Sequence, residues 1–260
     1  MRIFTFVLLT PLLLLSPLFL LSQTTESQLS VNKGVAVVEL FTSQGDINCP
    51  LADKLLSAII ADAAKNNKPV FCLSMHVDFW NRYGWKDPFS SLKYTNRLQN
   101  YTTVLGLKET YTPFMLVNGR SIVEGTEFNK ANEIIIKALL APAKLEPTFV
   151  WEIFDDTLDI SYQVGTGKIS GKSGADKYIN VAIVEKGLST KVDKGDNAGK
   201  TLLNDNVARL FHACDLNSSK GLIRIPLKKL KPGDSKSIVL FIQEKTTRKV
   251  LGATSAKFNK

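Results

Sequence analysis

Two short apolar segments separated by an amphipathic segment constrain the fold of this chain more than any other feature of its sequence. Residues Val35 to Phe41 and Val70 to His76 are rich in β-branched and other apolar residues, which is typical of buried strands. Pro50 stands where the first turn of a helix tolerates proline, and Lys68-Pro69 ends the helical pattern. Apolar residues recur between them with helical spacing, at Leu51, Leu55, Leu56, Ile59, Ile60 and Ala63. Two strands joined by a helix predict a right-handed parallel β-α-β unit.

The segments that follow extend this unit. Residues 77–90 form an aromatic insert, and a second helix is expected from Ser90 or Ser91 to Val104. The dipeptide Asn118-Gly119 is a hairpin signal between two short apolar segments, and a closing helix follows Gly125. The predicted order is therefore β-α-β-α-β-β-α, with the hairpin strands at Phe114 to Val117 and Ser121 to Val123.

Helical periodicity nearly vanishes after Ala141-Pro142 and Glu146-Pro147, so a domain boundary is expected there. Several short alternating segments with Gly, Ser and Lys-rich turns then predict a small β-sandwich. One segment, Leu202 to Ala213, fits a helix and a strand equally well. The predicted organisation is a signal peptide over residues 1–22, an α/β domain over residues 31–141 and an all-β, sandwich-like domain over residues 146–260.

The N-terminal residues are typical of a secretory signal peptide. Arg2 precedes an uncharged, leucine-rich stretch from Ile3 to Leu21, and polar residues follow from Ser22. An uncleaved membrane anchor is the alternative, because about 20 apolar residues can span a bilayer, although Pro11 and Pro17 interrupt the helix that this needs. The sequence thus predicts an exported, periplasmic or extracellular protein with no stable membrane span after cleavage.

The formal net charge is +9, and residues 220–260 account for all of it, with 11 Lys and Arg residues against Asp234 and Glu244. A basic surface can attract nucleic acid or anionic lipid. These basic residues alternate with apolar ones, however, and no nucleic-acid-binding motif accompanies them. We therefore interpret them as a solvated sheet face and expect no nucleic-acid partner.

The junction between the first strand and the first helix carries the residues best suited to chemistry. Cys49 lies at the expected helix start, where the helix dipole favours a thiolate if the sulfur is exposed. Asp46 precedes Cys49 by three residues. Glu39 lies in the apolar first strand, where its carboxylate is either solvent-facing at an edge or buried and able to relay a proton.

Several motifs carry a resemblance to known proteins. The predicted order of elements, a cysteine at the first helix start and Thr112-Pro113 before the third strand resemble the thioredoxin fold, in which that proline is cis and packs beside a CxxC motif. The chain more closely resembles exported bacterial proteins catalogued as a domain of unknown function, number 1223, with the motif E-L-F-T-S-Q-G-C-S-S-C-P. The matching segments are Glu39 to Pro50, His76 to Trp80, Gly84 to Phe89, Tyr111 to Pro113, Val117 to Gly119 and Gly195 to Leu202.

The chain departs from this motif at one decisive position, because Asp46 stands where the family has the first cysteine. In thioredoxin-like enzymes that cysteine is the attacking thiolate, so its loss excludes two-thiol exchange at this site. Asp46 can still accept N–H bonds at the helix start. Its negative charge is also expected to raise the pKa of Cys49.

The other two cysteines give no clear replacement. Cys72 lies in the second apolar strand and is expected in the core, and Cys214 lies in the C-terminal half. A disulfide between Cys49 and Cys72 is one alternative if their Cα atoms approach within about 4.4 to 6.8 Å. Three free thiols are the other.

Two further groups of residues have alternative interpretations. His76 and Asp78 end the second strand, where they form either a structural His–Asp hydrogen bond or, with Cys49 and Asp46, a zinc or copper site. Trp80 and Trp85 either cover the core or line a groove for an extended peptide beside Thr112 and Pro113.

The leading hypothesis is an exported thioredoxin-like protein that has lost the dithiol and acts as a non-redox binding or scaffold module of the cell envelope. Its partner would be an extended peptide or an envelope protein, with no cofactor. The alternatives are a monothiol oxidoreductase, in which Cys49 reacts and Glu39 relays a proton, and metal binding through Cys49 and His76. Whether the chain is an enzyme stays open at this point.

Overall fold

The computed structural model describes residue 1 and residues 34–165, 176–228 and 230–259, so the predicted signal peptide lies outside the described residues. The described residues from Gly34 onward group as one compact unit. The helices are α1 (Cys49–Lys65), α2 (Leu92–Val104) and α3 (Phe128–Leu140), with a short 3-10 helix η1 (Phe79–Tyr83). The strands are β1 (Ala36–Thr42), β2 (Val70–His76), β3 (Phe114–Val117), β4 (Ser121–Val123), β5 (Glu146–Phe154), β6 (Thr157–Gly165), β7 (Lys177–Glu185), β8 (Leu188–Lys191), β9 (Thr201–Asn204), β10 (Val207–Asp215), β11 (Lys220–Pro226), β12 (Lys236–Glu244) and β13 (Val250–Lys257).

The elements of the N-terminal half occur in the order expected from the sequence. Every residue of β1 is buried, because this strand pairs with β2 on one side and β3 on the other and is covered on both faces. β1 and β2 run parallel, and β3 and β4 are antiparallel around Asn118-Gly119. Ser91 begins α2 as its N-cap, with a side chain that accepts from the Lys93 N–H.

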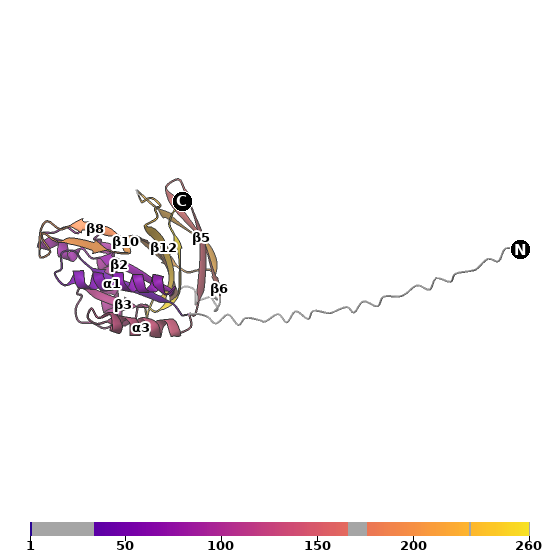
Figure 1. The fold of residues 1–260 in the computed structure, drawn as a ribbon, viewed down its shortest axis with the longest axis horizontal. Coiled ribbons are helices and arrows are strands. Elements are labelled where there is room, and N and C mark those ends of the chain that lie inside the picture. Colours follow the sequence, from indigo (N-terminus) through magenta and orange to yellow (C-terminus); the bar gives the residue numbers. More distant parts are fainter. Residues whose placement is uncertain (2–33, 166–175, 229, 260) are drawn as a thin grey trace. The chain divides into compact units, whose positions relative to one another are not determined.

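The strands of the C-terminal half continue the same sheet. Its order is β13-β12-β7-β10-β2-β1-β3-β4, and β10 joins it at the outer edge of β2 (Figure 1). That junction is short: Val207 is registered with Ser74, and the Ser74 N–H donates to the Asn206 carbonyl at 2.9 Å. β10 thus covers an edge of β2 that the N-terminal half alone would leave unpaired. The ambiguous segment 202–213 lies largely in strands β9 and β10.

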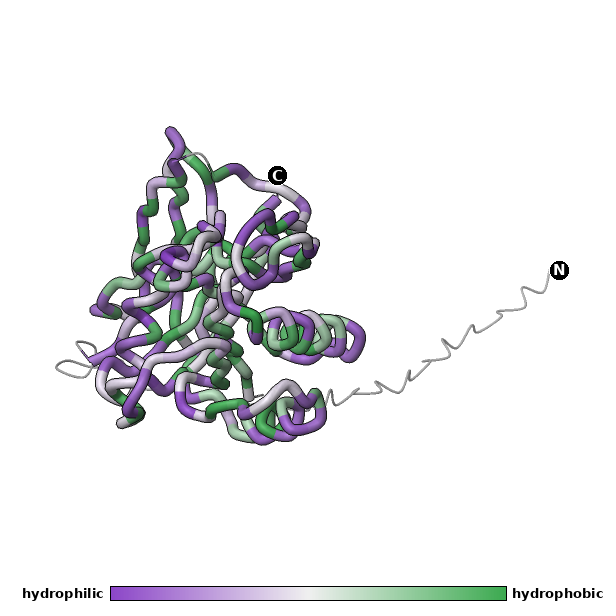
Figure 2. The backbone as a smooth tube through the Cα atoms, turned by 90° about the vertical axis from the view of Figure 1, so that its left-hand side faces the viewer, coloured by the Kyte–Doolittle hydropathy of each residue, from purple (hydrophilic) through white to green (hydrophobic). Residues whose placement is uncertain are grey.

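The large sheet is covered on both faces. Cys72 of β2 packs in the apolar cluster with α1 and α3, whereas its neighbour Leu73 packs on the α2 face. On β7, Ala182 belongs to the α2 face, while Val181 packs against the three-stranded sheet β11-β6-β5. Helices α1 and α3 and the small sheet therefore share one face, and α2 covers the other. In Figure 2, hydrophobic stretches alternate with hydrophilic ones along the backbone.

The predicted fold class, a thioredoxin-like α/β domain followed by a separate β-sandwich, is wrong. The structure is rich in strands and is built on a mixed eight-stranded sheet that both halves of the chain share. The error has a physical reason: apolar alternation in segments such as 177–184 and 237–243 indicates a strand, but it does not indicate which neighbour that strand pairs with.

Candidate functional site

The loop between β1 and α1 is organised around the buried side chain of Asp46. Its carboxylate accepts hydrogen bonds from Thr112 Oγ1 at 2.6 Å, from the Asn48 N–H at 2.9 Å and from Cys49 Sγ at 3.2 Å. Asn48, the N-cap residue of α1, makes no side-chain capping bond, so the Asp46 carboxylate satisfies a backbone donor at the helix start. Asp46 therefore holds the helix start, as the sequence predicts.

The Cys49 thiol is fully buried behind this loop. Burial raises the pKa of Cys49 well above its ordinary value, and the negative charges of Asp46 and Asp53 raise it further. The sulfur also accepts from the Ser43 N–H at 3.3 Å. All three cysteines are free thiols, so the alternative of a Cys49–Cys72 disulfide is not realised. A protonated, inaccessible thiol is a poor nucleophile.

Alkylation in the folded protein checks this assignment. At pH 8 we expect iodoacetamide to modify Cys49 at least ~100-fold more slowly than in the guanidinium-unfolded chain, because little thiolate forms and the reagent lacks access. Cys214 is only half-buried and is the internal control, expected to react before Cys49. Peptide mass spectrometry follows each site, and equal rates in folded and unfolded protein would contradict the assignment.

Trp80, Thr112 and Pro113 join the same network. Trp80 Nε1 donates to Thr112 Oγ1 at 2.7 Å, and the Thr112 hydroxyl donates its own proton to the Asp46 carboxylate. The Thr112–Pro113 peptide bond is cis. Trp85 also contacts the loop, where its Nε1 donates to Gln44 Oε1 at 3.2 Å. Both indoles thus fasten the aromatic insert to the loop.

Asn197 fastens the C-terminal half to this loop. Its side-chain amide donates to the Gln44 and Asp46 carbonyls, each at 3.0 Å, and its own oxygen accepts from Lys200 Nζ at 2.9 Å. A buried loop has carbonyl groups that need donors, and Asn197 supplies them. The segment Gly195 to Leu202, which the sequence analysis noted only as a family match, therefore belongs to the site.

His76 is fully buried and pairs with Asp87, not with Asp78. Its Nδ1 lies 2.7 Å from Asp87 Oδ2, and the same carboxylate oxygen accepts from the Gln44 N–H at 2.8 Å. Burial alone would lower the pKa of His76, but the Asp87 carboxylate raises it above its ordinary value. Asp78 instead accepts from Thr95 Oγ1 at 2.6 Å, at the start of η1.

Asp53 of α1 is a buried carboxyl that the sequence analysis missed. Burial raises its pKa to about 7, and the neighbouring His76 limits the rise. Thr42 and Asn204 lie near the carboxyl without forming a full hydrogen bond with it. Five buried polar atoms in this cluster have no hydrogen-bond partner among the described residues, namely Thr42 Oγ1, Asp53 Oδ1, Ser74 Oγ, His76 Nε2 and Asn204 Nδ2. Such a concentration of unpaired polar atoms is uncommon and characteristic of functional sites.

A cavity of about 620 Å³ opens between α1 and β9, with Asp53 in its lining. Its apolar residues include Ile47, Leu51 and Leu203, which are 48%, 59% and 69% exposed. Lys54, Lys200 and Asp205 also line it. We call this cavity the α1–β9 groove. A concave apolar surface with a perturbed carboxyl is a standard setting for ligand recognition.

Glu39 lies on the opposite face of the sheet from α1. Its carboxylate accepts from Arg97 Nε at 2.6 Å and Arg97 Nη2 at 3.0 Å, and also from the Tyr101 hydroxyl. Both residues belong to α2, which packs on the face of β1 that also carries Val37 and Phe41. The structure therefore places Glu39 in an ion-pair network with Arg97, away from the Cys49 thiol.

Comparison with protein families matches residues 37–243 to the protein of unknown function family DUF1223. The chain belongs to this family. Comparison with curated proteins finds no match.

Two solved structures share the fold of this DUF1223 chain. Protein AGR_C_4864 from Agrobacterium tumefaciens is 23% identical, with a TM-score of 0.63 over 87% of this chain and 96% of that one. HBP35 of Porphyromonas gingivalis is 14% identical, with a TM-score of 0.61 over 87% of this chain and 76% of that one. At these identities the likeness concerns the fold alone.

In the part of this DUF1223 chain that the structure describes, no group of three or more His, Cys, Asp and Glu side chains is arranged to hold a metal ion. Within the same residues, no helix has the length and apolar character needed to cross a bilayer.

The sequence carried a signal for Asp53. This residue lies four positions after Cys49 and three before Leu56, both buried on α1, so helical spacing places its side chain on the inward face. Asp87 lies in the matching segment Gly84 to Phe89, but nothing in the sequence indicated that it pairs with His76. Asn204 gave no signal, because it meets Gln44 across 160 residues. Of the predicted residues, Asp46, Cys49, Trp80, Thr112 and Pro113 come together at one end of α1.

Proposed function

We propose that this protein is an exported, non-redox binding protein of the cell envelope that holds an extended segment of a partner protein in the α1–β9 groove. We interpret Asp46-Ile47-Asn48-Cys49 as a CxxC motif that has lost its first cysteine. The observation that carries the proposal is the contrast at the start of α1, where the thiol is buried while apolar side chains beside it are exposed.

The groove has the chemistry of a peptide-binding surface. Ile47, Leu51 and Leu203 offer apolar contact, and clustered exposed apolar side chains favour protein contacts over solvent. Lys54 and Lys200 bring charge to the same surface, which suits a segment that alternates apolar and polar side chains. The loop below the groove is held by the bonds of Asp46 and Asn197, so little ordering entropy is lost when a peptide binds.

The alternatives receive less support from the geometry. A monothiol oxidoreductase needs an accessible thiolate, whereas Cys49 is buried and has a raised pKa. Glu39, its expected proton relay, bonds to Arg97 on the other face of the sheet. A metal site through Cys49 and His76 lacks a third ligand among the described side chains.

Introducing a charge into the groove tests the proposal. Peptides selected from a displayed random library on the wild type are expected to carry apolar side chains and to bind Leu51→Glu and Leu203→Glu at least about tenfold more weakly, because one buried leucine is worth about 1.5–3 kcal/mol. Fluorescence anisotropy of a labelled peptide gives the Kd values.

Two control variants accompany this measurement. Leu222→Glu changes a similarly exposed leucine on β11, outside the groove, and is expected to bind like the wild type. Cys49→Ser keeps a hydroxyl donor for Asp46 and is also expected to bind normally. Selection of no apolar peptide, or loss of binding in Cys49→Ser with retention in Leu51→Glu and Leu203→Glu, would refute the proposal.

A further inference from the structure

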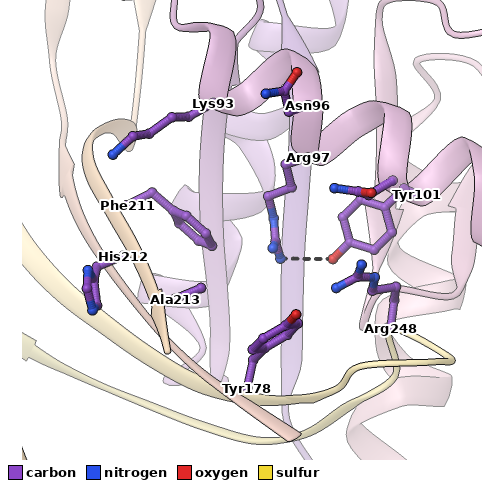
Figure 3. A pocket seen from close by; sticks show the side chains of 10 residues that line it. Lys93, Asn96, Arg97, Tyr101, Tyr178, Phe211, His212, Ala213 and Arg248 are labelled. Atoms are coloured by element: carbon purple, nitrogen blue, oxygen red, sulfur yellow. Dashed lines mark hydrogen bonds between the residues drawn. The ribbon is translucent and has the colours of Figure 1, made fainter. Parts of the chain in front are cut away.

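A second cavity lies on the α2 face of the sheet, opposite the face that carries α1. It has a volume of about 400 Å³ and is lined by residues of α2, β10, the start of β7 and the turn between β12 and β13 (Figure 3). We call it the α2 pocket. This volume falls within the range of pockets that bind small molecules.

Three cationic side chains line the α2 pocket: Lys93 and Arg97 from α2, and Arg248 from the β12–β13 turn. None of the described residues that line it is acidic. Glu39 lies beneath Arg97 and balances one of the three charges. Two positive charges therefore remain without a counter-charge in the lining. This excess attracts anions, because a concave protein wall concentrates the field.

These cations retain unused hydrogen-bond donors. The bonds of Arg97 to described residues use Nε and Nη2, so the Nη1 donors have no protein acceptor among them. Arg248 Nε is buried and has no hydrogen-bond partner among the described residues. Lys93 Nζ forms no ion pair with the described residues. Burial lowers the pKa of His212, and the positive charge of Lys93 lowers it further. Arginine N–H groups that have no protein acceptor match the oxygens of carboxylate or phosphate groups.

The backbone fixes Arg248 in place. Its φ is +61°, a left-handed conformation that is uncommon for residues other than glycine, and its carbonyl accepts from Gln243 Nε2 at 2.6 Å. Gly119 packs so closely that a Cβ there would stand 2.0 Å from the Arg248 carbonyl oxygen. Such strain persists only where the surroundings impose it, and it is most often found at functional sites. The turn thus fixes the backbone of Arg248 at the pocket.

Aromatic rings form the remaining walls. The Arg97 guanidinium lies 4.6 Å from the ring centroid of Phe211, and Arg248 lies 5.7 Å from that of Tyr178. Figure 3 shows Phe211 to the left of Arg97 and Tyr178 below its guanidinium. Ring faces next to these cations suit a ligand that combines an anionic group with an apolar or planar body.

We propose that the α2 pocket binds a small organic oxyanion, in which a carboxylate or phosphate group meets Arg97 Nη1, Arg248 and Lys93 and an apolar or aromatic body packs on Phe211 and Tyr178. This site is separate from the α1–β9 groove and does not depend on peptide binding there.

Calorimetric titration with four probes tests the proposal: phenyl phosphate, benzoate, inorganic phosphate and phenol. We expect the two organic oxyanions to bind, inorganic phosphate to bind more weakly because it lacks the apolar body, and phenol to show no binding. Lys93→Gln and Arg248→Gln each remove a charged donor and are expected to weaken phenyl phosphate binding about tenfold or more. The Kd is also expected to rise with salt concentration.

Lys249→Gln is the matched control, because it removes the same charge from the neighbouring exposed residue, which does not line the pocket. Its Kd is expected to remain within about twofold of the wild type. Failure of both organic oxyanions to bind at 10 mM, on the order of the weakest useful affinity, would overturn the proposal. Equal weakening in Lys249→Gln and Arg248→Gln would also overturn it, since that pattern indicates nonspecific attraction. Circular dichroism shows that each variant is folded.

Discussion

Replacement of Arg97 by methionine is expected to destabilise the folded protein by about 3–5 kcal/mol, because it leaves the Glu39 carboxylate buried without its cation. Glu39 and Arg97 lie 2.6 Å apart with side chains that are 1% and 11% exposed. Methionine keeps most of the side-chain length that packs near Phe211 and Phe241, so the loss reports chiefly on the ion pair. The Tyr101 hydroxyl still donates to Glu39 and limits the cost.

Urea unfolding of four proteins measures this effect: the wild type, Arg97→Met, Glu39→Gln and the double variant. We expect the double variant to recover part of the stability lost in Arg97→Met, because no unpaired charge remains buried. Arg224→Met is the matched control, since Arg224 is 70% exposed in its pair with Asp159 and is expected to cost at most ~1 kcal/mol. A loss of similar size in Arg97→Met and Arg224→Met would show that the Glu39 pair is not energetically distinct.

Local patterns in the sequence predicted the N-terminal half well. The dipeptide Asn118-Gly119 predicted a hairpin turn, and both residues have positive φ, at 50° and 67°. The strand Phe114–Val117 and the end of α2 at Val104 fall where the apolar pattern and its breaks placed them. Each of these features is set by residues close together in the chain, so a single sequence contains the information.

The C-terminal half and the deeper site depend on contacts that span most of the chain. Gln44 meets Asn204 across 160 residues, and Asn197 meets Asp46 across 151. A pattern of alternating apolar residues identifies β7 and β12 as strands but carries no information on their partners. The separate β-sandwich was therefore a wrong inference from correct strands. For the same reason the ion pair of Glu39 with Arg97 was missed, because 58 positions separate the two residues in the chain.

Replacement of Asp53 by asparagine is expected to stabilise the protein at pH 8 and to change it little at pH 4. Burial raises the pKa of Asp53 to about 7, from an ordinary value of 3.8. The free energy of unfolding therefore falls as pH rises. In the unfolded chain this carboxyl ionises from about pH 4, whereas in the folded chain it stays protonated until about pH 7. That difference corresponds to roughly 4 kcal/mol at alkaline pH, which asparagine would recover. Urea unfolding at pH 4, 6 and 8 measures it.

The buried His76 side chain affects how large the gain in stability of Asp53→Asn is. Its pKa is raised by Asp87 and, to a lesser extent, by Asp53, so its contribution to stability is present below about pH 6.5 and is lost as pH rises through the folded value. The asparagine of the Asp53→Asn variant carries no charge and lowers that contribution, which makes the observed gain smaller than the full value of roughly 4 kcal/mol. Asp62→Asn is the control, because Asp62 is partly exposed and already paired with Lys68. A gain for Asp53→Asn that is the same at pH 4 and pH 8 would show that its carboxyl titrates normally, and the α1–β9 groove would then lack a protonated acid at neutral pH.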